Sequence, residues 1–78
     1  MKSYKKFIPV SQRPLTNREY EVLKLLTQGK TNTEIKEKLG ITIHTTKAHM
    51  SSILLKMKAR DRLQAVIKAL NEGWIMPE

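Results

Sequence analysis

The chain has 78 residues, and its 15 Lys and Arg residues outweigh seven Asp and Glu residues to give a net charge of +8. That length allows one small domain, and the charge favours a polyanionic partner, either nucleic acid or an acidic membrane surface. Because the sequence has no cysteine and only two histidines, it excludes disulfides and thiolate metal sites and makes a structural zinc site unexpected.

Residues 1–14 contain four basic residues, two prolines and no acidic residue, and they show no helical period. We expect a flexible basic arm, which is either a solubilising tail or a segment that contacts phosphate or a partner. No apolar run approaches the roughly 20 residues of a membrane-spanning helix, and the arm lacks the apolar stretch of a secretory signal. We therefore expect a cytoplasmic protein without a membrane partner, in which residues 15–76 form the folded domain.

A capping box predicts where the first helix begins. The hydroxyl of Thr16 can accept from the backbone at Glu19, while the Glu19 carboxylate reaches back to the free N–H of Thr16. Apolar residues then recur at helical spacing until Gly29, which suits the left-handed position after a helix. The pattern predicts a helix over about 17–28.

The next two helices follow with a short turn between them. A second capping box, Thr31 with Glu34, begins a helix of about two turns that Gly40 ends. Thr42 is a good N-cap for a third helix over about 43–58. A helix, a short turn with glycine and another helix are typical of the helix-turn-helix motif.

Asp61 is the next cap, and it predicts a fourth helix from about Arg62 to Glu72 that closes at Gly73. No segment has a convincing strand pattern, and there are no internal repeats. The predicted fold class is all-α, with four helices.

The third predicted helix has two distinct faces when its residues are placed at 100° intervals. One stripe is expected to face the core and consists of Ile43, Thr46, Met50, Ile53, Leu54 and Met57. The opposite face collects His44, Ala48, Ser51, Ser52 and Leu55. From Lys38 to Arg60 there are five basic residues and no acidic one, so this segment is positively polarised, as a phosphate-facing element should be.

Short and polar outward residues suit a helix that reads the major groove, because its backbone can then approach the base edges. Lys47, at the edge of this face, can donate to guanine O6 or N7. We expect base contacts from His44, Lys47, Ala48 and Ser51. We expect phosphate contacts, which fix the register, from Thr31, Asn32, Thr45, His49, Ser52 and Lys56. Two plainer interpretations stay open: the hydroxyls are simply solvated, and His49 is a partly buried histidine bonded within the domain.

An enzymatic interpretation has little support, because a catalytic site needs a nucleophile, a base and an orienting group in one pocket. His44 and His49 are five residues apart, which places them about 140° apart on one helix, so they cannot readily share a metal. The sequence has no glycine-rich phosphate loop. We expect no metal site, no cofactor and no small-molecule ligand.

From about Leu15 to Ile75, many positions fit one pattern in a single register without gaps. The pattern consists of Leu15-Thr-x-Arg18-Glu19-x-Glu21-Val22-Leu23-x-Leu25-Leu26-x-x-Gly29, Thr31-Asn32-x-Glu34-Ile35, Leu39, Thr45-x-Lys47-x-His49, Ile53, Lys56-Met57, Arg62, Ala65-Val66, Ala69 and Gly73-x-Ile75. It resembles the LuxR-type DNA-binding domain, also called FixJ- or NarL-type and GerE-like.

The resemblance implies a four-helix domain that binds duplex DNA as a dimer with its third helix in the major groove. The positions of Lys47, Ala48 and Ser51 would face the bases, and those of Thr45 and His49 would lie near the backbone. Most such proteins carry a receiver or ligand-binding domain before this one, whereas only 14 residues precede the motif here. The chain is therefore expected to be either a stand-alone regulator or a fragment of a longer protein.

Three positions depart from the family pattern. Thr46 stands where Val is usual, so a hydroxyl faces the core and can bond an upstream carbonyl. Lys36 replaces a small Ala, and its long side chain must reach past its neighbours to solvent. Ser51 stands where some relatives carry Lys, which predicts a shorter-reaching or water-mediated base contact.

The fourth helix has more apolar surface than a small domain can bury. Small residues at 65, 66 and 69 suit the domain's own core, which leaves a second stripe of Leu63, Ile67, Leu70 and Trp74. An exposed stripe of this kind usually marks an interface. We expect a homodimer through this helix, unless Trp74 folds back and covers the stripe.

Together these features predict a sequence-specific, double-stranded-DNA-binding transcription regulator, associated with the nucleoid, that binds an inverted repeat as a homodimer. RNA polymerase is a further candidate partner. The alternative is a protein-interaction module of the same fold that pairs with another regulator. A third hypothesis is non-specific coating of nucleic acid through the basic arm.

Overall fold

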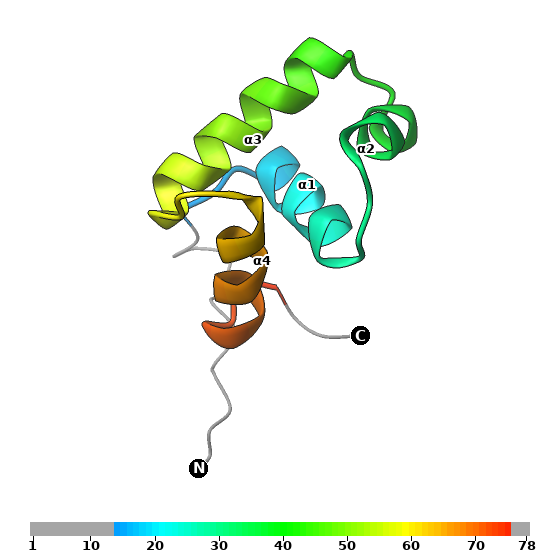
Figure 1. The fold of residues 1–78 in the computed structure, drawn as a ribbon. Coiled ribbons are helices and arrows are strands. Elements are labelled where there is room, and N and C mark those ends of the chain that lie inside the picture. Colours follow the sequence, from blue (N-terminus) through cyan, green and yellow to red (C-terminus); the bar gives the residue numbers. More distant parts are fainter. Residues whose placement is uncertain (1–13, 76–78) are drawn as a thin grey trace.

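The computed structural model describes residues 14–75, which form four helices in the order that the sequence predicts (Figure 1). They are α1 (Asn17–Thr27), α2 (Asn32–Leu39), α3 (Ile43–Met57) and α4 (Arg62–Asn71). No strand occurs within residues 14–75, so the all-α fold class is confirmed. All of the predicted basic arm except Pro14 lies outside the described residues.

The helix boundaries follow from local capping, as the sequence predicts. In both capping boxes the reciprocal hydrogen bonds are present: Thr16 with Glu19 at 2.9 and 3.1 Å, and Thr31 with Glu34 at 2.8 and 3.1 Å. Each pair satisfies two backbone N–H groups that a helix start would leave free. Helices α1, α3 and α4 end one residue earlier than predicted, because their next residues serve as C-caps.

The cap of α3 was not predicted. Lys58 ends this helix in the left-handed conformation, with φ of 56°, a region that favours glycine. Its backbone N–H still donates to Leu55, and Ala59 donates to Leu54. The chain thereby turns sharply toward α4, while Asp61 caps α4 by accepting from the backbone of Gln64 at 2.8 Å.

The core lies where α1 meets α3 and α4, and α2 packs against α3 and the end of α1 (Figure 1). Fully buried residues come from all four helices: Val22, Leu23, Ile35, Thr46, Ile53, Ala65 and Ala69. Because α3 is buried along one side only, its opposite side stands at the surface. The packing of the other three helices therefore holds α3 in place and leaves one of its sides exposed to solvent.

The prediction that one stripe of α3 faces the core is confirmed for Thr46, Ile53 and Met57, which are buried. As predicted, the Thr46 hydroxyl donates to the Thr42 carbonyl oxygen, at 3.0 Å, so its burial leaves no unpaired polar group. The prediction for Ile43 is wrong. This residue begins α3, where the helix extends past the core, and its side chain is exposed.

Two further searches cover only the residues that the structure describes. No helix among them is long and apolar enough to cross a membrane. They also contain no cluster of three or more His, Asp or Glu side chains arranged to hold a metal ion.

Candidate nucleic-acid interface

The outer side of α3 is left uncovered by the packing of the other helices. All four residues predicted to read bases are exposed on it: His44, Lys47, Ala48 and Ser51. Within residues 14–75, no hydrogen bond or ion pair occupies their side chains. The donors of Lys47 and Ser51 are therefore free to bond a ligand.

The start of α3 adds hydroxyl groups beside this face. Thr42 accepts from the backbone N–H of Thr45 at 3.0 Å and donates its own hydroxyl hydrogen to the Thr45 hydroxyl oxygen, also at 3.0 Å. Since the Thr45 oxygen is the acceptor in that bond, its hydrogen remains available to an acceptor outside the domain. His49, one turn further on, is half-buried.

The start of α2 is held by a side chain from α4. Arg62 donates through Nη2 to the carbonyl oxygen of Lys30 at 2.9 Å and through Nη1 to Oδ1 of Asn32 at 3.2 Å. With its amide oxygen engaged in this way, Asn32 keeps its NH₂ group for an external acceptor. Thr31 and Asn32 thus lie at a helix start with donors to spare, as the phosphate prediction requires.

Ser52 and Lys56 have a partner within the domain that the sequence analysis missed. Ser52 donates to Oε2 of Glu19 at 2.6 Å, and the Lys56 ammonium lies 2.9 Å from Oε1. The predicted phosphate contacts of these two residues are untested, but their polar groups are already engaged. The three residues tie the start of α1 to the middle of α3.

The same contacts set the charge of Glu19, whose side chain is buried. Burial alone raises the pKa of this carboxyl group, but hydrogen bonds from Ser52, the backbone of Thr16 and Lys56 outweigh it and lower the pKa to about 2. Glu19 is therefore ionised at neutral pH and neutralises Lys56. Among the basic residues of α3, this leaves Lys47 with its full positive charge at the outer face.

Sequence reasoning could not find this cluster, because Glu19 lies 33 and 37 residues from its partners. The capping box already explained Glu19 locally, and only the three-dimensional packing of α1 on α3 adds its second role. One usable signal was the i, i+4 spacing of Ser52 and Lys56, which places them on the same flank of one helix.

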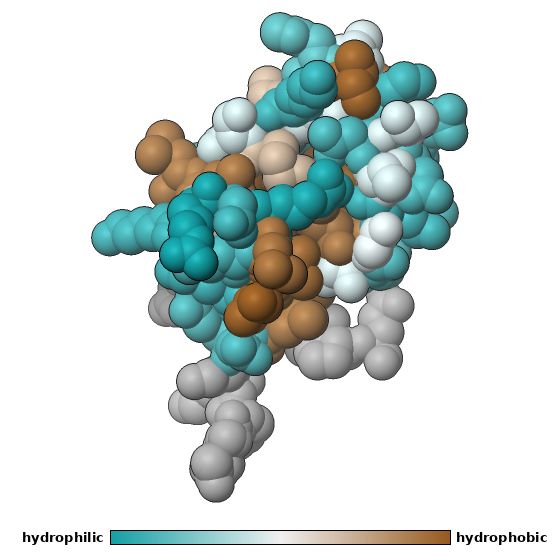
Figure 2. Space-filling model, in the orientation of Figure 1, coloured by the Kyte–Doolittle hydropathy of each residue, from teal (hydrophilic) through white to brown (hydrophobic). Residues whose placement is uncertain are grey.

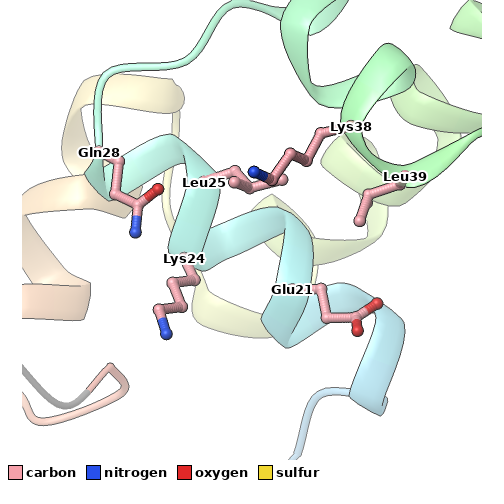
Figure 3. Close-up of a pocket in the computed structure, with 6 residues that line it drawn as sticks. All are labelled: Glu21, Lys24, Leu25, Gln28, Lys38 and Leu39. Atoms are coloured by element: carbon pink, nitrogen blue, oxygen red, sulfur yellow. The ribbon is translucent and has the colours of Figure 1, made fainter.

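A shallow groove of about 280 Å³ lies between α1 and the end of α2 (Figure 3). Its lining residues are Glu21, Lys24, Leu25, Gln28, Lys38 and Leu39. Lys38 extends from α2 over Leu25, and the polar ends of Glu21 and Lys24 point outward from α1 (Figure 3). The side chains that line it include no histidine, cysteine or hydroxyl group.

The apolar stripe on α4 is also at the surface. Leu63, Ile67 and Leu70 are between 48 and 67 % exposed, and hydrophobic side chains gather over α4 in the space-filling view (Figure 2). Trp74 is half-buried against the core, and its indole N–H donates to Glu72 at 3.1 Å. It therefore does not cover the three aliphatic residues.

Residues 13–69 match the GerE family, described as bacterial regulatory proteins of the luxR family. The chain belongs to the luxR family. The resemblance predicted from the helix-turn-helix pattern is thus confirmed, together with the four-helix fold.

Several relatives of the luxR domain are named as regulators. The chain is 49% identical over 61 residues to the transcriptional regulatory protein DegU of Brevibacillus brevis, and 53% identical over 55 residues to the transcriptional regulatory protein LiaR of Bacillus subtilis. It is 48% identical over 61 residues to the response regulator protein VraR of Staphylococcus aureus.

These alignments take in 78, 70 and 78% of this chain but only 26, 26 and 29% of the respective relatives. The chain thus spans little more than a quarter of the length of the proteins that it matches.

Proposed function

We propose that this luxR domain binds duplex DNA in a sequence-specific manner and thereby regulates transcription. The observation that carries the proposal is the outer side of α3, where four exposed and unengaged side chains lie in a segment without acidic residues. A polyanion is the partner that such a surface attracts most strongly. The names of the relatives DegU and LiaR as transcriptional regulatory proteins support the same function.

In the proposed complex α3 lies in the major groove. Ala48 and Ser51 are small enough to let the helix backbone approach the bases, Lys47 donates to guanine O6 or N7, and His44 contacts a base edge near the helix start. Ser51 has a short side chain, which makes a water-mediated contact the natural one for it.

Phosphate contacts hold the helix in register. Donors at the starts of two helices supply them: the Asn32 amide and Thr31 hydroxyl on α2, and the Thr45 hydroxyl and His49 on α3. Ser52 and Lys56 act mainly through Glu19, by fixing α3 on α1. In addition, these two residues are candidates for weaker contacts with DNA phosphates at the edge of the groove.

The domain acts as a homodimer in this proposal. Leu63, Ile67 and Leu70 form an exposed stripe on α4, and two copies related by a two-fold axis would cover it with a self-complementary contact. Trp74 lies at the border of that contact. The same axis would present two copies of α3 to successive major grooves, so the target is an inverted repeat.

The second candidate function rests on the same stripe. An exposed aliphatic surface on α4 equally suits a module that pairs with a different regulator. Such a module would not need α3 to read bases, so it would show no sequence preference on DNA.

The first proposal, regulation through DNA binding, has three further parts. The domain contacts RNA polymerase, it is located in the cytoplasm at the nucleoid, and it acts without a cofactor or metal.

Selection of bound duplexes from a random pool, followed by gel shifts, tests the proposed function. We expect a recurrent sequence with two-fold symmetry. Lys47→Ala should weaken or relax its recognition, whereas Lys38→Ala, which removes the same charge at the end of α2, should leave the preference unchanged. A pool that yields no recurrent sequence would favour the interaction module.

A further inference from the structure

Leu55 is the most exposed large hydrophobic residue in the part of the chain that the structure describes. It lies in the last turns of α3, and the residue is 80 % exposed. Its neighbours Ile53 and Met57 are buried in the core. Nothing in the packing of the domain therefore accounts for a leucine at this position.

The position of Leu55 on the helix is informative. Residues 44, 48, 51 and 55 are spaced by four, three and four, which puts them on one side of a helix. Leu55 thus extends the face on which His44, Ala48 and Ser51 lie. It stands two turns beyond Ala48, about 10 Å along the axis at 1.5 Å per residue.

The charge around Leu55 indicates what covers it. Lys56, Lys58 and Arg60 follow it directly, and no acidic residue occurs between Lys38 and Arg60. A protein partner for Leu55 would have to bring acidic groups to this segment, whereas duplex DNA brings phosphates on both sides of its groove. The one apolar group that the major groove presents is the C5-methyl group of thymine.

We propose that Leu55 packs against a thymine methyl group and is a specificity-determining residue of α3. This inference rests on the proposed function and adds a residue and a base to it. Lys47 would select a guanine near the start of the helix, while Leu55 would select a thymine near its end. Removing a methyl group from such a contact forfeits the burial of about one carbon, which corresponds to roughly fourfold in affinity.

The test replaces each thymine of the selected duplex in turn by deoxyuridine, which lacks only the methyl group. Dissociation constants are measured for the wild type, for Leu55→Ala and for Lys38→Ala, a control that truncates an exposed side chain at the end of α2. We expect one thymine in each half-site at which deoxyuridine weakens the wild type about fourfold. Leu55→Ala should abolish that difference, and Lys38→Ala should keep it.

The outcomes separate this inference from the proposed function. If the wild type binds the selected duplex but is insensitive to every thymine methyl group, or if Leu55→Ala keeps the same sensitivity, Leu55 does not read thymine while the proposed function stands. If no duplex is bound at low salt, both are overturned. Because Leu55 is exposed, its replacement should leave the circular dichroism and thermal midpoint of the domain nearly unchanged.

Discussion

The polar side chains of this domain include some that hold α3 in place and others that α3 exposes at its outer surface. Glu19 belongs to the first group, because its carboxylate accepts from the backbone N–H of Thr16 at the start of α1 and also binds Ser52 and Lys56 of α3. Lys47 belongs to the second group, because it is exposed and bonds no other residue among those described. The two groups should respond differently to substitution.

Glu19 gives the domain a defined sensitivity to acid. Its pKa is lowered from an ordinary 4.5 to about 2 in the folded state, so the unfolded chain takes up the proton first. The stabilisation is complete above pH 4.5 and is lost as the pH falls toward 2, by up to roughly 3 kcal/mol. Urea denaturation followed by circular dichroism between pH 6 and 3 should show the greater part of this loss.

The matched control for Glu19→Gln is Glu21→Gln, which changes an exposed carboxylate paired with Arg18. Glu19→Gln should be less stable at neutral pH and should lose less on acidification, whereas Glu21→Gln should follow the wild type. Parallel pH profiles for the wild type and Glu19→Gln would show that the carboxylate is not the acid-sensitive group.

The two lysines of α3 are expected to separate recognition from stability. Lys47→Ala should cost about 1–3 kcal/mol in binding to a site whose guanine it contacts, with a stability change within about 0.5 kcal/mol. Lys56→Ala should lower stability by about 1 kcal/mol, because it removes a partly screened partner of Glu19, and should weaken all duplexes alike. Equal stabilities, or an equal loss of sequence preference, would contradict this division.

At the scale of elements, α4 has one side in the core and one side at the surface, and the surface side is expected to form the dimer. Ile67→Glu places a charge in the middle of the stripe, where burial against a second copy would be costly. We expect it to abolish cooperative binding to the full inverted repeat and to leave binding to a half-site unchanged. Analytical ultracentrifugation and gel shifts on both duplexes measure this, with Glu72→Gln as a control at the end of α4.

The dimer prediction fails if the wild type occupies a full site as a monomer, or if Ile67→Glu binds the full site as cooperatively as the wild type. The same measurement also distinguishes the two candidate functions. A module that pairs with another regulator would remain monomeric alone on every duplex.

The elements themselves were predictable because their signals are local. Each helix begins at a capping residue within three positions of its partner, and Gly40 has the left-handed backbone expected of a helix end. The contacts between elements were not predictable. The bond between Arg62 and Asn32 spans 30 residues, and no periodicity in the sequence encodes it. Ile43 was misplaced because a helical wheel gives direction but not how far the core extends along the axis.

For the candidate interface, the sequence predicted which residues of α3 would be exposed but not which were engaged elsewhere. His44, Lys47, Ala48 and Ser51 are on the outer side as expected. Ser52 and Lys56 were placed beside them by angle alone, although both bond to Glu19. Whether a polar group is free depends on which other helix packs against its flank, and that is a property of the tertiary fold.

At the scale of the whole molecule, the net charge of +8 and its distribution set how binding should depend on salt. Each neutralised phosphate releases counterions, so the logarithm of the affinity falls with the logarithm of the salt concentration by about 0.9 per contact. A dimer that makes roughly six to ten phosphate contacts should lose several powers of ten in affinity between low and moderate salt. Contacts with the bases, in contrast, should keep their preference at each salt concentration.

The most direct test of the central claim is therefore a salt titration of affinity on two duplexes, the selected sequence and a scrambled one of equal composition. Fluorescence anisotropy of labelled duplexes gives both curves. We predict parallel, steeply falling lines in which the selected duplex stays tighter throughout. Affinity that does not change with salt, no binding at low salt, or coincident lines for the two duplexes would contradict the claim that α3 reads DNA.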